Sequence, residues 1–124
     1  MIKIETSNNQ LEFRPGETVS VAVTWDLESG DAGLELALLW YTQGKGTEDI
    51  KSVWSEQIAS SGRRGTRSFR VPLPAAPYSC SGKYVSICWA IEAVDSSGNE
   101  VTRQEIVIAP NGKPVSLVNT SDSI

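Results

Sequence analysis

The stretch from Gly82 to Val101 constrains the fold of this chain more than any other part of the sequence. Up to residue 94, apolar side chains dominate one parity, which holds Val85, Ile87, Trp89, Ile91 and Ala93, while the other parity is mixed. Side chains alternate between the two faces of a β-strand, so this pattern is typical of a strand that buries one face. Residues 95–100, Asp-Ser-Ser-Gly-Asn-Glu, then form a turn. The stretch predicts a central strand packed against a second sheet.

Further segments alternate in the same way and are separated by Gly, Pro, Asn and Ser. Leu34–Tyr41 would also suit a helix, but its short length and the glycines before it favour a strand. The sequence therefore predicts seven to eight short strands and no helix longer than a turn or two. Alternating strands hide one face each by stacking two sheets, so we expect an all-β fold, a two-sheet antiparallel β-sandwich of the immunoglobulin-like class.

A length of 124 residues suits one domain. We expect the sandwich to span residues 1–110. Residues 111–124 are rich in Asn, Ser, Gly and Pro, which is typical of a flexible C-terminal tail. Pro72, Pro74 and Pro77 rule out a central strand between Val71 and Ser79, and this segment should cross from one sheet to the other.

The composition excludes several chemistries. The chain has no histidine, which removes Ser-His-Asp and Cys-His catalysis and the commonest zinc ligand. Its two cysteines, Cys80 and Cys88, form no C-x-x-C pair; Cys88 lies in an apolar strand and is expected to be a small buried side chain, while a disulfide between the two stays open. The carboxylates are scattered. We predict a protein that is not an enzyme, with no catalytic residue, no cofactor and no metal site.

Charge and hydropathy bear on partners and location. A net charge of −4 argues against binding to nucleic acid, which needs clustered cations. No apolar run approaches the roughly 18 residues of a membrane helix, and the start of the chain lacks the pattern of a secretory signal. We expect a cytoplasmic protein without a transmembrane segment.

Four arginines between residues 63 and 70 make the one concentrated charge. Arg67 shares its parity with Phe69, so its stem should lie along the edge of the core, whereas Arg63, Arg64 and Arg70 should point to water. Guanidinium groups bind anions in a planar, bidentate manner, so these three residues are candidates for contact with a phosphopeptide, a phospholipid headgroup or an acidic partner. The plainer alternative is a solvated loop that balances nearby carboxylates.

The tryptophans offer a second candidate surface. Trp25, Trp40 and Trp89 lie on the apolar parity of their strands and are expected in the core. Trp54 lies in an irregular segment, and if any aromatic residue is exposed for binding, we expect it to be Trp54, together with Tyr41. These two aromatic residues are the candidate contact for a small-molecule or carbohydrate ligand.

Two passages resemble the arrestin-like β-sandwich family. Residues 13–21 read Phe-Arg-Pro-Gly-Glu-Thr-Val-Ser-Val, similar to the family's opening of an aromatic residue, Pro-Gly-Glu and a strand. Residues 69–74, Phe-Arg-Val-Pro-Leu-Pro, followed by residues 81–87 and the strand from Trp89 to Asp95, are similar to its later pattern. Together the passages span most of residues 1–110.

The resemblance implies a non-catalytic adaptor or scaffold that binds a protein partner; bacterial relatives are linked to sporulation control. The family usually has two tandem sandwiches and this chain has one, so the interdomain hinge of two-domain members is not expected here. No binding residue of the family can be assigned to this chain. The expected partner is another protein, or a second copy that forms a homodimer through a sheet edge.

Overall fold

The computed structural model describes residues 1–27, 33–44, 49–58, 63–81, 85–95, 100–110 and 115–116. Seven strands in these residues have five or more residues: β1 (Ile2–Thr6), β3 (Thr18–Asp26), β4 (Leu34–Gly44), β5 (Ile50–Ile58), β6 (Arg64–Pro72), β8 (Val85–Asp95) and β9 (Val101–Ile108). The remaining elements are three two-residue strands and one short 3-10 turn: β2 (Glu12–Phe13), β7 (Cys80–Ser81), β10 (Val115–Ser116) and η1 (Ser7–Asn9). The predicted strand count and the strand at Leu34–Tyr41 are confirmed.

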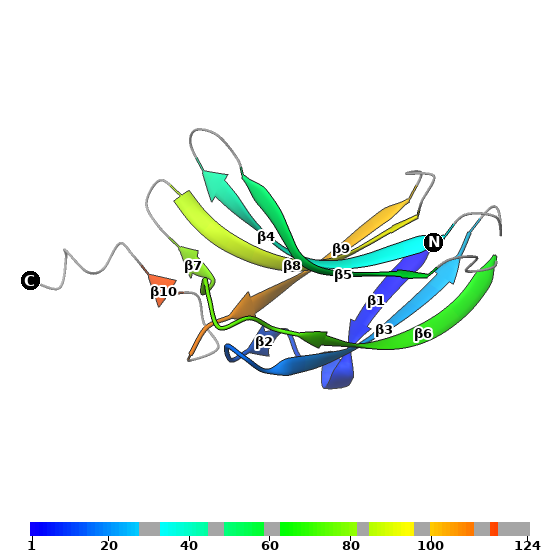
Figure 1. Cartoon of the computed structure of the whole chain (residues 1–124), viewed down its shortest axis with the longest axis horizontal. Helices are drawn as coiled ribbons and strands as arrows, with labels where there is room; N and C mark the ends of the chain where they lie inside the picture. Colours follow the sequence, from blue (N-terminus) through cyan, green and yellow to red (C-terminus); the bar gives the residue numbers. More distant parts are fainter. Residues whose placement is uncertain are drawn as a thin grey trace, which may run out of the picture.

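The strands form two stacked sheets (Figure 1). The smaller sheet has the order β1-β3-β6, and the larger has the order β10-β7-β8-β4-β5, with β9 also paired to β8 and β2 paired to β9. All pairs between the longer strands are antiparallel. Only β2 with β9 and β10 with β7 pair in parallel among the described strands. The antiparallel sandwich is confirmed, and β8 is the central strand that the sequence predicted.

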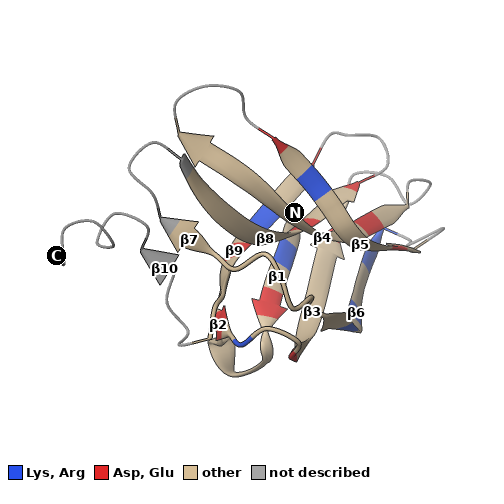
Figure 2. Cartoon of the chain, turned by 60° about the vertical axis from the view of Figure 1, so that its left-hand side comes forward, with Lys and Arg blue, Asp and Glu red and all other residues tan. Residues whose placement is uncertain are grey.

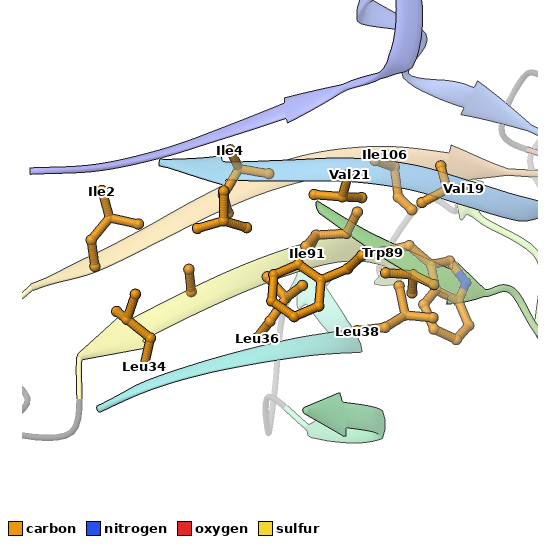
Figure 3. Close-up of a cluster of buried hydrophobic side chains, with 14 of the residues drawn as sticks. Ile2, Ile4, Val19, Val21, Leu34, Leu36, Leu38, Trp89, Ile91 and Ile106 are labelled. Carbon is orange, nitrogen blue, oxygen red and sulfur yellow. The ribbon is translucent and has the colours of Figure 1, made fainter. Parts of the chain in front are cut away.

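The core lies between the sheets and follows the alternation of the sequence. Trp89 and Ile91 of β8 have no exposed surface, and Val21 of β3 is 2% exposed. Figure 3 shows that side chains from β1, β3, β4, β8 and β9 meet in this layer. Burial of this apolar surface is the main force that holds the two sheets together.

The proline-rich segment leads from β6 in the smaller sheet to β7 in the larger sheet, as predicted. Hydrogen bonds hold this segment to the larger sheet at two residues. The indole Nε1 of Trp89 donates a hydrogen bond to the carbonyl oxygen of Pro77 at 3.0 Å. The backbone amide of Ile108 donates to Oγ of Ser79 at 2.9 Å, and the amide of Ser79 donates back to the carbonyl oxygen of Ile108 at 2.7 Å. The crossing therefore satisfies polar groups that would otherwise be buried without partners.

The two flanks of the sandwich differ. On one flank the sheets are joined, because Oγ1 of Thr102 in β9 donates to the carbonyl oxygen of Ile2 in β1 at 2.9 Å. On the other flank β5 ends the larger sheet and β6 ends the smaller sheet. We call the flank formed by β5 and β6 the open flank.

Two sequence predictions fall largely outside the described residues. Of the predicted tail, only Val115–Ser116 is described, and it pairs with β7. Of the turn predicted at residues 95–100, Asp95 is the last residue of β8, and residues 96–99 lie outside. No helix in the described ranges is long and apolar enough to cross a membrane.

Candidate functional site

The open flank brings together charged residues from two edge strands. Nη2 of Arg67 in β6 lies 3.8 Å from Oε1 of Glu56 in β5, so an ion pair spans the mouth of the sandwich. The guanidinium of Arg67 also lies over the ring of Phe69, 5.0 Å from its centroid. The predicted position of the Arg67 stem along the edge of the core is confirmed. Charges that point inward on edge strands oppose pairing with arbitrary other chains.

The backbone of β6 offers hydrogen-bonding groups on its free side. The amide of Leu27 donates to the carbonyl oxygen of Arg63 at 2.7 Å, and the amide of Leu73 donates to Glu17 at 2.8 Å. The register between β3 and β6 runs without a shift. Because bonded and non-bonded pairs alternate in an antiparallel ladder, the odd-numbered residues of β6 bond to β3. The even-numbered residues therefore direct their backbone groups away from β3: Arg64, Thr66, Ser68 and Arg70.

The arginines predicted as an anion contact are all exposed but do not form one cluster. Nε of Arg63 donates to the carbonyl oxygen of Leu27 at 3.2 Å, and Nε of Arg64 lies 3.2 Å from Oδ2 of Asp26. Arg70 lies six residues further along β6 than Arg64, or about 20 Å at the rise of a strand. Figure 2 shows the blue of basic residues recurring along β6. The arginines form a line along an edge strand instead of a compact pocket.

The aromatic residues predicted as a ligand platform lie on opposite faces of the larger sheet. Trp54 pairs with Leu38, whose side chain is buried in the core, whereas Tyr41 lies on the outer face. Trp54 is partly buried and packs against the core, as Trp40 does. Trp25 and Trp89 are buried, as predicted. Trp54 and Tyr41 therefore cannot contact one ligand together.

Tyr41 instead belongs to a polar cluster that the sequence did not predict. Its hydroxyl donates a short hydrogen bond to Glu105 of β9, although Tyr41 pairs with Cys88 of β8. The ring therefore crosses over β8. The guanidinium of Arg103 lies 5.0 Å from the ring centroid and donates to Oε2 of Glu92 at 2.8 and 3.1 Å.

This cluster has two physical consequences. It covers the outer face of the sheet, where Ala90 has no exposed surface and Leu39 is 3% exposed, although solvent-facing positions in a sandwich are normally polar. Burial, and then the hydrogen bond to Glu105, raise the pKa of Tyr41 to about 12. The phenol therefore donates this hydrogen bond at neutral pH.

Beside the cluster lies a shallow cavity of about 220 Å³, where β7 and β9 both approach β8. Cys80 and Cys88 line it, and both are free thiols, so no disulfide joins them. The expectation that Cys88 is a buried side chain was wrong, because its parity places it on the outer face, where it is half-buried and donates to Oε1 of Gln43 at 3.7 Å. Burial, and then the charge of Glu105, raise the pKa of the Cys88 thiol. A protonated thiol is a poor nucleophile and metal ligand.

Among the described residues, no group of three or more His, Cys, Asp or Glu side chains is arranged to hold a metal ion. Among the described residues, the line of arginines and the outward backbone groups of β6 both offer groups for binding. Both belong to the open flank.

Comparison with known proteins gives a fold and no family. No protein-family description and no curated protein matches the sequence. Among solved structures, the sporulation control protein Spo0M from Bacillus subtilis matches with a TM-score of 0.54 and 19% identity, over 87% of this chain and 49% of that chain. A β-glucosidase from Listeria innocua matches with a TM-score of 0.46 and 18% identity, over 93% of this chain and 16% of that chain.

At such low identity these matches concern the fold alone. The Spo0M match supports the arrestin-like form of the β-sandwich that the sequence predicted. This chain spans about half the length of Spo0M. The β-glucosidase match covers a small part of that enzyme and carries no argument about activity.

Proposed function

We propose that this chain is a non-catalytic protein-interaction module of arrestin-like fold that binds its partner through the open flank. The observation that carries the proposal is that β6 ends its sheet with exposed side chains and with backbone groups directed away from β3. Such an edge binds an extended segment of another protein by adding it as a strand.

Three further observations support an interaction module over an enzyme or a protein that binds a small molecule. Spo0M, which has a similar fold, is described as a sporulation control protein, in keeping with a regulatory role. The chain has no histidine, and burial raises the pKa of both the Tyr41 phenol and the Cys88 thiol. The separation of Trp54 from Tyr41 weakens the alternative of a carbohydrate or small-molecule ligand.

The test is affinity capture from the lysate of the source cell with the tagged chain, read by mass spectrometry. Two proline variants probe the two edges of the open flank. Ser68→Pro removes a backbone N–H that points away from β3, so it breaks no hydrogen bond within the sheet. The native Pro72 lies at an equivalent position of the same strand. Ser52→Pro makes the equivalent change in β5. The amide of Thr42 donates to Asp49, so odd-numbered residues in this part of β5 bond to β4 and the amide of residue 52 faces outward.

We expect a stoichiometric partner that is captured by the wild type and lost in at least one proline variant. The controls are Ser52→Ala and Ser68→Ala, which keep the amide and should capture normally. Equal capture by all variants, or no captured protein, would refute the proposal. The melting temperature of each variant shows whether its sandwich is intact.

A further inference from the structure

The charge along β6 is opposite to that of the chain as a whole. Residues 63–72 contain four arginines and no Asp or Glu, in a chain whose net charge is −4. The side chains of Arg64 and Arg67 are 72% and 47% exposed, and Arg70 is exposed as well. The edge of this sheet is therefore cationic along most of its length.

Two copies of β6 are poorly suited to pair with one another. In an antiparallel two-fold pairing centred on Arg67, Arg64 would lie opposite Arg70 of the second copy, and the two Arg67 side chains would face each other. Like charges directly opposite in a ladder are destabilising. In this register the edge therefore disfavours a second copy of itself, while Thr66 and Ser68, whose backbone groups point away from β3, are exposed residues.

The spacing of the arginines specifies a complementary strand. Arg64 and Arg70 point to the outer face of the smaller sheet, and Arg67 points to the other face, toward the mouth of the sandwich. In an added strand, residues directly opposite these three are spaced i, i+3 and i+6. Alternation places the first and last on the outer face and the middle one on the inner face, the same faces as their arginines.

We propose that β6 binds an extended acidic segment of a partner protein as an added strand, with carboxylates at positions i, i+3 and i+6 facing Arg64, Arg67 and Arg70. This inference rests on the proposed function and specifies the chemistry of its partner. Carboxylate and guanidinium groups form bidentate, charge-assisted hydrogen bonds. The present ion pairs of Arg64 with Asp26 and of Arg67 with Glu56 are solvent-exposed, and such pairs contribute little, so they compete weakly with a partner.

The second edge of the open flank is less suited to this role. The pairing of β5 with β4 shifts register between Leu38 and Leu39, which places a bulge near Val53. A bulge interrupts the regular row of edge groups and twists the strand. The side chains of β5 also include both Lys51 and Glu56, so it presents no uniform charge.

The experiment uses the isotope-labelled full chain and an acetylated peptide, Glu-Thr-Val-Glu-Val-Thr-Glu, followed by NMR. We expect the peptide to perturb β6, and to slow hydrogen exchange at the amides of Thr66 and Ser68, which face outward. The amide of Phe69, which already bonds to β3, should change little. A peptide of the same composition with its three glutamates adjacent should bind more weakly by about tenfold or more, because its carboxylates cannot face all three arginines.

Three variants decide between outcomes. Ser68→Pro should abolish binding, Ser68→Ala should preserve it, and Arg64→Glu with Arg70→Glu should weaken it by about tenfold or more. No binding of the spaced peptide, or binding that survives Ser68→Pro, would overturn strand addition at β6. A lysate partner lost only in Ser52→Pro would overturn the inference while the proposed function stands, and capture of nothing would refute the proposed function itself.

Discussion

Replacing Gly65 by alanine tests the packing that holds β6 against β3. Gly65 lies directly opposite Trp25 in the ladder between these strands. A Cβ atom at residue 65 would lie 2.5 Å from Cζ2 and 2.9 Å from Cε2 of the Trp25 indole. Carbon atoms in contact are normally about 3.5–4.0 Å apart, so the ring would have to move by about 1 Å. Trp25 is 5% exposed and packs in the core, so the movement displaces its neighbours.

The expected magnitude follows from two opposing terms. Overpacking of a close-packed core lowers the free energy of unfolding by about 1–3 kcal/mol. Alanine restricts the unfolded chain more than glycine does, which returns about 0.4–1 kcal/mol. The central values of these two terms, about 2 and about 0.7 kcal/mol, give a net loss of about 1.3 kcal/mol, which for a domain of this size corresponds to a fall in melting temperature of roughly 3–7 °C.

Thermal and urea unfolding followed by circular dichroism measure this change. Ser68→Ala, at an exposed position of the same strand, is the matched control and should change stability by less than about 0.5 kcal/mol. A smaller ring at residue 25 should relieve the clash, so Gly65→Ala should cost less in a Trp25→Phe background than in the wild type. An unchanged or higher melting temperature for Gly65→Ala, or strict additivity in the double variant, would refute the reasoning.

Three further predictions concern the larger sheet. Tyr41 should ionise at a pH near 12 in an absorbance titration, and Tyr41→Phe should remove that step. Because folding raises the pKa of Tyr41 from 10, the stabilisation that comes from its protonated phenol is complete below pH 10 and is lost as pH rises toward 12. Trp89→Phe should lower stability by about 1–3 kcal/mol in urea unfolding, because it leaves a cavity and an unpaired Pro77 carbonyl group; an unchanged midpoint contradicts this. Cys88 should react with iodoacetamide more slowly than a free model thiol at pH 8, and equal rates would show that the pKa of its thiol is not raised.

Local alternation was sufficient to predict most of the fold. The parity of Trp89, Ile91 and Ala93 identified the buried face of β8, because one buried face imposes a period of two on any strand of a sandwich. The same reasoning placed the Arg67 stem along the core beside Phe69. It did not place Trp54, because the bulge near Val53 inserts a residue and reverses the parity along β5.

The contacts across strands were beyond local reasoning. The cluster of Tyr41 and Glu105 joins residues 64 positions apart, and it forms only because β4 and β9 both flank β8. Strand order and register determine such contacts, and neither follows from composition or spacing. The burial of Ala90 on the outer face has the same origin. The arginines of β6 could be seen in the sequence, but their position on a sheet edge required the strand order.

The open flank illustrates how the protection of an edge strand also determines what can bind there. A joined flank, such as the one where Thr102 bonds to Ile2, leaves little edge for a new strand. The β6 edge directs backbone groups of exposed residues away from β3 and is protected mainly by arginines, including the inward-pointing Arg67. An edge that carries only positive side chains repels strands that are also positively charged. An extended segment with three spaced carboxylates meets no such repulsion, so the residues that keep two copies of β6 apart are the same residues that select an acidic partner.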